Sequence, residues 1–233
     1  IYTLSLHDAL PISSLPLFGA SFISMYLSNA PRFAIDRYLD PTQQGYFAIL
    51  FMPAVTINLM SLVIFRPLLT PMAALWARGA RPEFTRLVRR GLASALAAFG
   101  VVALITYAAG PPLLALVFGK DVSAFSVELM VLVAGGAMNA ASVVLYYALA
   151  TMRLQSTIFL GYALAALVMT ALCLTLVPAH ALLGAALAYS GAMGVLTLSF
   201  AAVLHYCQAS AAGVGGAGGA GSAGGQAGAG DVA

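Results

Sequence analysis

Charged side chains are scarce in this chain: only 7% of its 233 residues are Asp, Glu, Lys or Arg. A soluble globular domain carries about 25% charged residues, so the composition excludes a soluble domain. Cysteine is nearly absent as well, with two residues. Cys173 and Cys207 are expected near opposite ends of neighbouring membrane spans, about 30 Å apart. We therefore expect two free thiols rather than a disulfide.

Groupings of side chains that support catalysis or metal binding are also missing from the sequence. No paired carboxylates and no Ser/His/Asp or Cys/His set occur with supporting spacing. His180 and His205 are expected at opposite faces of the membrane. Lys120 follows Gly119, but a phosphate-binding loop would need glycine where Leu114 stands. We therefore expect no enzyme activity, no metal site and no bound cofactor.

Hydrophobic residues, by contrast, make up 62% of the chain, and its mean hydropathy is +0.98. Apolar runs of about 20 residues, each long enough for a helix that crosses a bilayer, recur along the sequence. They predict an all-α, polytopic bundle of six transmembrane helices. The third is expected to end before Gly110, Pro111 and Pro112, with a partly buried turn over 113–118. The expected spans are 15–33, 46–65, 92–109, 127–152, 157–177 and 182–206.

Positive charge is concentrated in one stretch, residues 66–90, which holds six of the ten Lys and Arg residues. Basic residues in short loops beside membrane spans stay on the cytoplasmic side, so we expect this stretch in the cytoplasm. Alternation from it places Arg153 and the C-terminal tail inside too, giving seven positive residues inside and three outside. The net charge of +3 could also indicate nucleic acid, but topology explains arginines beside spans better, and no nucleic-acid partner is expected.

The basic stretch leaves one question of topology open. The second span either ends at Arg66, followed by a half-buried extension, or continues to Trp76 with Arg66 turned inward. Further on, Pro82 starts a short helical run whose apolar residues share one face, so that it can lie on the anionic inner leaflet. The apolar residues are Phe84, Leu87 and Val88, and the arginines that point elsewhere are Arg86, Arg89 and Arg90.

The two ends of the chain are expected to lie outside the bundle, which comprises residues 14–208. Residues 1–13 contain no initiator Met and no Lys or Arg, and their string SLHDALPI resembles translated sequencing adapter. We therefore interpret them as non-native read-through and expect the protein to be truncated at its N-terminus. Residues 209–233 are rich in Gly and Ala, with ten glycines between Gly213 and Gly230. This composition predicts a disordered cytoplasmic tail.

Polar residues within or beside the first two spans are candidates for a substrate pathway, because charge inside a span is costly unless it is paired or faces a cavity. Asn29, Arg32 and Asp36 share a face if the first span stays helical through Pro31. An i, i+4 ion pair between Arg32 and Asp36 is the alternative. Asn58 either faces a cavity or bonds to a neighbouring helix. The full set is Asn29, Arg32, Asp36, Arg37, Asn58 and Arg66.

Three stretches, taken in order, resemble the polysaccharide flippases of the multidrug/oligosaccharidyl-lipid/polysaccharide exporter superfamily. The first ends a span in Asp36 and Arg37 and starts the next helix at Gly45 and Tyr46. The second is a proline followed by a small basic helix, residues 67–90. The third is the outer turn 116–121. The stretches read SNAPRFAIDRYLDPTQQGYFAILF, FRPLLTPMAALWARGARPEFTRLVRRGL and PPLLALVFGKDVSA.

The resemblance implies one six-helix lobe, the C-terminal half, of a two-lobe transporter in the bacterial inner membrane. Its partners would be the missing N-terminal lobe, the phospholipid bilayer and a lipid-linked oligosaccharide or polysaccharide precursor that is flipped by alternating access. Arg32, Arg37 and Arg66 would suit its pyrophosphate. A cation-coupled multidrug exporter of the same superfamily is one alternative, and would need an acid within a span. A membrane-embedded glycan polymerase or ligase is the other, and would need a large outer loop.

Overall fold

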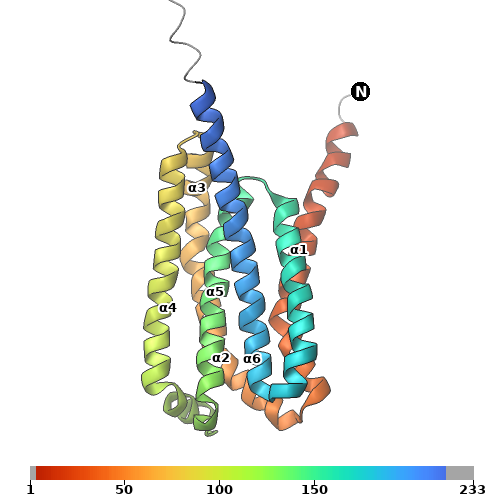
Figure 1. The fold of residues 1–233 in the computed structure, drawn as a ribbon, viewed down its shortest axis with the longest axis vertical. Helices are drawn as coiled ribbons and strands as arrows, with labels where there is room; N and C mark the ends of the chain where they lie inside the picture. Colours follow the sequence, from red (N-terminus) through yellow and green to blue (C-terminus); the bar gives the residue numbers. More distant parts are fainter. Residues whose placement is uncertain (1–3, 219–233) are drawn as a thin grey trace, which may run out of the picture.

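The computed structural model describes residues 4–218, which form helices joined by short turns, with no strand in that range (Figure 1). Four stretches are long and apolar enough to cross a membrane: Pro41–Ala77, Arg81–Phe118, Ser123–Thr151 and Gln155–Ala209. The prediction of an all-α fold is confirmed, and these four stretches are compatible with a membrane protein, whereas the count of six crossings stays a prediction. The elements are α1 (Leu4–Tyr38), α2 (Pro41–Phe65), the 3-10 turn η1 (Arg66–Leu68), α3 (Leu69–Ala77), α4 (Arg81–Phe118), the 3-10 turn η2 (Ser123–Phe125), α5 (Ser126–Thr151) and α6 (Gln155–Gly218).

The last helix, α6, folds back on itself, and Figure 1 shows its two limbs side by side. The reversal occurs at Ala181, whose φ of 51° and ψ of −127° are not helical. Gly184 allows the tight return, because a β-carbon at this position would collide with the backbone carbonyl of Leu176. The turn lies where the sequence predicts one, immediately after Pro178 and the exposed His180.

The turns gather at two ends of the bundle. The α3–α4 and α5–α6 turns lie at one end, and the α1–α2 and α4–α5 turns lie at the other with the reversal of α6 (Figure 1). Residues 66–90 and Arg153 therefore share one end, while Arg37 and Lys120 belong to the other. Alternation of the spans, starting from residues 66–90, predicts this distribution of the basic residues between the two ends. The side of the membrane that each end faces stays a prediction.

The buried core is formed mainly by α5, by both limbs of α6 and by the facing sides of α1 and α2. In α5, Gly135 and Gly136 bring the backbone close to its neighbours, since a β-carbon on Gly136 would lie 3.0 Å from Cα of Ala54 in α2. Small residues at helix contacts are the usual means of close packing in bilayers. By contrast, α4 packs along one side of the bundle against α5 and α2, and most of its surface is exposed.

Two boundaries differ from those that the sequence predicts. Gly110, Pro111 and Pro112 do not end the third span, because α4 continues through them to Phe118 and no turn forms over 113–118. Prolines are tolerated in membrane helices where surrounding groups compensate for the lost hydrogen bond, and Gly110 is buried beside Leu129 of α5. The predicted amphipathic run after Pro82 is the beginning of this same helix, with Phe84 and Val88 buried.

Neither alternative for the second span is correct as stated. The helical stretch continues to Ala77 through η1, but Arg66 is exposed rather than turned inward. At the C-terminal side, α6 continues to Gly218, past the expected end of the last span. Residues 1–3 and 219–233, which belong to the expected read-through and tail, lie outside the described residues.

Candidate functional site

A cavity of about 190 Å³ lies between α1, α2, α5 and both limbs of α6. Its lining is unusual for so apolar a bundle, because it contains serine, asparagine and tyrosine side chains. Polar residues within membrane-spanning helices commonly face the interior of the bundle or a water-filled space. The polar residues that line it are Ser24, Ser28, Asn58, Asn139, Tyr146, Tyr147, Tyr162 and Tyr189.

Two asparagines on facing helices supply the amide groups of the cavity. Asn58 of α2 has no hydrogen-bond partner among the side chains and backbone that the structure describes. Asn139 of α5 accepts a hydrogen bond at its backbone carbonyl from the Ser142 hydroxyl, at 2.7 Å. An amide offers two donors and one acceptor. Asn58 therefore presents free donors and an acceptor to the cavity, which favours the first of the two readings of this residue.

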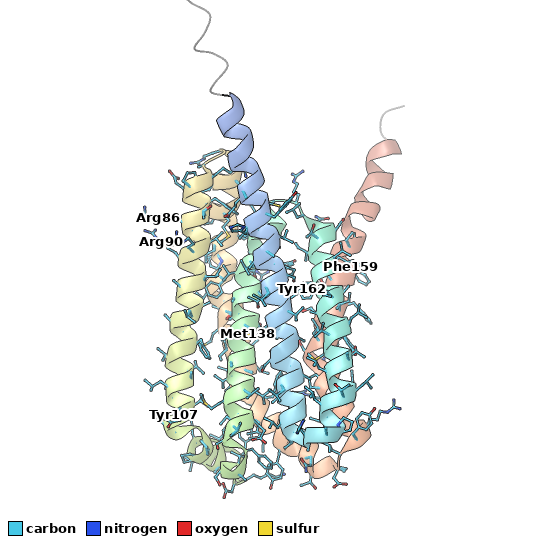
Figure 2. All side chains as sticks on the ribbon, viewed as in Figure 1. Arg86, Arg90, Tyr107, Met138, Phe159 and Tyr162 are labelled. Carbon is cyan, nitrogen blue, oxygen red and sulfur yellow. The ribbon has the colours of Figure 1, made fainter. Side chains whose placement is uncertain are left out.

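Tyrosines extend the polar lining toward the α5–α6 turn. The Tyr146 ring lies 5.6 Å from Tyr147 and 6.5 Å from Tyr162, and both pairs are edge-to-face. Figure 2 shows Tyr162 within the bundle rather than on its outer edge. A second hollow of about 240 Å³ shares Ser24, Tyr146 and Tyr162 with the first. The two hollows therefore adjoin at these three residues and form a tyrosine-rich path only as neighbouring spaces beside α1.

Arg32 lies beside this path at the other end of α1. Its guanidinium carbon is 5.7 Å from the centroid of the Phe51 ring, and Phe51 packs edge-to-face on Tyr189, 4.8 Å away. The Nε atom of Arg32 is buried and makes no hydrogen bond among the described residues. The alternative for this residue, an ion pair with Asp36, does not form among the described residues, and the Asp36 side chain is exposed. Arg32 is thus a cation with an unused donor near the cavity wall.

The other residues predicted for the site lie apart from it. Asn29 donates a hydrogen bond from its side chain to the Met25 carbonyl on its own helix, at 2.9 Å. Arg37 is exposed and lies over the ring of its neighbour Tyr38, 5.6 Å from the centroid. Arg66 is exposed near the opposite end of the bundle. Of the six predicted residues, the structure brings only Asn58 into the cavity, while Arg32 lies against Phe51, the ring that packs on the lining residue Tyr189.

Sequence reasoning missed the serines, Asn139 and the tyrosines. Asn139 carries the same signal as Asn58, an amide in the middle of an apolar run, and could have been found by it. Ser24 and Ser28 are four residues apart, on one face of α1. The tyrosines gave no such signal, because tyrosine near the end of a span usually marks the membrane interface.

No group of three His, Cys, Asp or Glu residues in the described part of the chain could hold a metal ion. Comparison with models of protein families, with curated proteins and with solved structures gives no significant match. The function must therefore be argued from the cavity, the charges and the stretches quoted above.

Proposed function

We propose that this chain is the C-terminal six-helix half of a flippase that moves a lipid-linked oligosaccharide or polysaccharide precursor across the bacterial inner membrane. The six crossings would be α1, the α2–α3 stretch, α4, α5 and the two limbs of α6, with residues 66–90 and the tail in the cytoplasm. The polar cavity inside an apolar bundle is the observation that carries the proposal. The stretches that resemble flippases support it independently.

The chemistry of the cavity suits a glycan. Serine hydroxyls and asparagine amides donate and accept hydrogen bonds as sugar hydroxyls require, and tyrosine adds an apolar ring face beside a hydroxyl. Arg32 offers donors that match a phosphate. Because its Nε is buried beside an aromatic ring, an anion there would be bound in surroundings of low dielectric, where charge-assisted bonds are stronger.

The size of the cavity fits one half of a pathway. Since a water molecule takes about 30 Å³ of liquid volume, a hollow of about 190 Å³ holds a few waters or part of one sugar ring. A complete oligosaccharide would need the wider space between two lobes, as in transporters built from repeats. A second, N-terminal lobe is therefore part of the proposal.

The test uses the whole protein, with both lobes, in proteoliposomes that contain a pyrophosphate-linked oligosaccharide lipid. Exposure of the glycan at the opposite face is followed with a lectin. Arg32→Ala removes the cation, and we expect the flipping rate to fall by about tenfold or more, since hydrogen bonds to charged groups contribute about 1.5–3 kcal/mol. Asn58→Ala should slow flipping by a smaller factor.

Arg153→Gln is the matched control, because it removes an exposed arginine from the α5–α6 turn. It should flip the lipid at the wild-type rate. Wild-type rates in both Arg32→Ala and Asn58→Ala, at equal protein abundance, would reject the site. Transport of cationic dyes but not of the glycan lipid would reject the flippase function and favour the multidrug exporter.

A further inference from the structure

The first turns of α4 carry an arginine cluster on the face that points away from the bundle. Figure 2 shows Arg86 and Arg90 on the outer edge, directed outward, and Arg89 is exposed with them. The opposite face of the helix is held in the core. Its buried residues recur at helical spacing: Phe84, Val88, Gly91 and Ala95.

The turn before this helix is fixed by aromatic contacts. The Trp76 ring of α3 lies 5.2 Å from Phe84, and the Arg81 guanidinium carbon lies 3.3 Å from the centroid of the Trp76 ring. Gly91 leaves room for Val144 of α5, since a β-carbon at this position would lie 2.9 Å from Val144 Cγ1. The arginine cluster is therefore presented on a braced helix, and Arg81 is occupied elsewhere.

Nothing in the described part of the chain neutralises the cluster. Arg86, Arg89 and Arg90 form no ion pair there, and the acid nearest in sequence, the exposed Glu83, pairs with none of them. Three like charges within about two helical turns repel one another. A bound anion would relieve that repulsion and satisfy the free guanidinium donors.

A hollow of about 750 Å³ lies at the cluster, lined by the three arginines with Pro82, Thr85 and Ala93. All six residues belong to α4, so the hollow is an open feature of the surface rather than an enclosed cavity. Directly beyond it, α4 turns a strongly apolar surface outward, in which Leu96 and Leu104 are about two-thirds exposed (67% and 68%). Charge and apolar surface thus follow each other along one exposed helix face, in the order of a phospholipid's headgroup and acyl chains.

We propose that Arg86, Arg89 and Arg90 bind the headgroup of an anionic phospholipid, whose acyl chains lie along the exposed apolar face of α4. Arginine binds phosphate oxygens through a planar pair of donors. Basic clusters at the membrane edge of a helix favour anionic lipids over zwitterionic ones. The continuity of the hollow with the apolar face favours a lipid over a free phosphate.

The test measures lipid binding to the purified full chain by native mass spectrometry, with phosphatidylglycerol and phosphatidylcholine as probes. The wild type should bind phosphatidylglycerol more tightly. Arg86→Gln with Arg90→Gln should weaken that binding by about 25-fold, because each basic residue near the surface contributes a factor of about five. Arg78→Gln with Arg153→Gln removes the same charge elsewhere at that end, and should leave binding within about twofold, since neither residue contacts the hollow and isolated exposed charges contribute little.

An equal loss of phosphatidylglycerol binding in the two double glutamine variants would indicate a general effect of charge and would overturn the site. Displacement of phosphatidylglycerol by inorganic phosphate at similar concentration would overturn the lipid assignment. The variant Arg86→Lys with Arg90→Lys keeps the charge. It gives a second measurement that does not depend on correct folding of the double glutamine variant. It should bind with intermediate affinity, and wild-type affinity would contradict the bidentate contacts.

Discussion

Two neighbouring helices, α4 and α5, are both long and apolar enough to cross a bilayer but have opposite surroundings. In the most apolar part of the α5 stretch, half of the residues are buried inside the protein, whereas in α4 the buried share is 17%. Both helices contain Gly and Ala, but the surroundings of these small residues differ. Gly135 and Gly136 of α5 touch the second limb of α6 and α2, whereas a β-carbon on Gly100 of α4 would meet nothing within 4 Å. Apolarity thus marks a span in both helices, but a small residue does not by itself mark a protein contact, because Gly100 of α4 is exposed.

The polar groups of the two helices differ in the same way. Asn139, Tyr146 and Tyr147 of α5 are uncharged and line the inner cavity. The arginines of α4 lie at the end of the span and face outward. An uncharged polar group is cheaper to bury than a charge, so the interior holds the amides and hydroxyls and the edge holds the cations. The cavity and the lipid site are therefore expected to fail independently when mutated.

The largest difference between the two helices should follow removal of a leucine side chain. Leu132 of α5 is fully buried and Leu104 of α4 is 68% exposed. We expect Leu132→Ala to cost about 2 kcal/mol or more, because it removes packing contacts and leaves a cavity. Leu104→Ala replaces one outward-facing side chain by a smaller one that faces the same surroundings. It should cost a small fraction of the free energy lost in Leu132→Ala. Unfolding in mixed detergent micelles gives both values, and equal losses would show that α4 is covered by protein.

A smaller contrast is expected when a methyl group is added. In Gly136→Ala the new β-carbon would lie 3.0 Å from Cα of Ala54. Backbone cannot yield as a flexible side chain can, so we expect about 1–3 kcal/mol of destabilisation. Gly100→Ala meets open space and should be neutral or stabilising by up to about 1 kcal/mol. The same unfolding measurement applies. A neutral Gly136→Ala would mean that α2 and α5 are farther apart than described.

The sequence predicts the helical membrane class well, because apolar content and charge scarcity leave no other option. Helical spacing also separates the exposed arginines of α4 from Phe84 and Val88, but the sequence places that apolar face on the lipid leaflet, whereas the structure buries both residues in the protein. Prediction from the sequence fails at Gly110 and Pro111, where packing against α5 carries the helix through residues that end helices in water. Local preference is overridden there by tertiary contact.

The site was harder to predict than the fold. Charge guided the choice of Arg32, Arg37 and Arg66, but only Arg32 lies near the cavity. The cavity is built from residues of five helical segments, and which uncharged residues converge depends on helix rotation. Asn58 could be recognised as a polar residue within a span, whereas Tyr162 could not be distinguished from an interfacial tyrosine without the packing.

The smallest expected effect concerns the turn that joins α4 to α5. The Ser123 backbone N–H donates a hydrogen bond to Asp121 Oδ1 at 2.9 Å, and this bond, with a second from the Ser123 side chain, lowers the pKa of Asp121 below its ordinary value of 3.8. A carboxyl group whose pKa is lowered in the folded state stabilises the protein at pH values above its ordinary pKa. This stabilisation is lost as the pH falls through the pKa of the folded state. Asp121→Asn keeps an acceptor but removes the titration, so its thermal midpoint should fall less than that of the wild type between pH 6 and pH 3. Because Asp121 is exposed, the difference should be smaller than either contrast above. Identical pH profiles would mean that the bond does not persist in solution and that the α4–α5 turn is looser than the helices it joins.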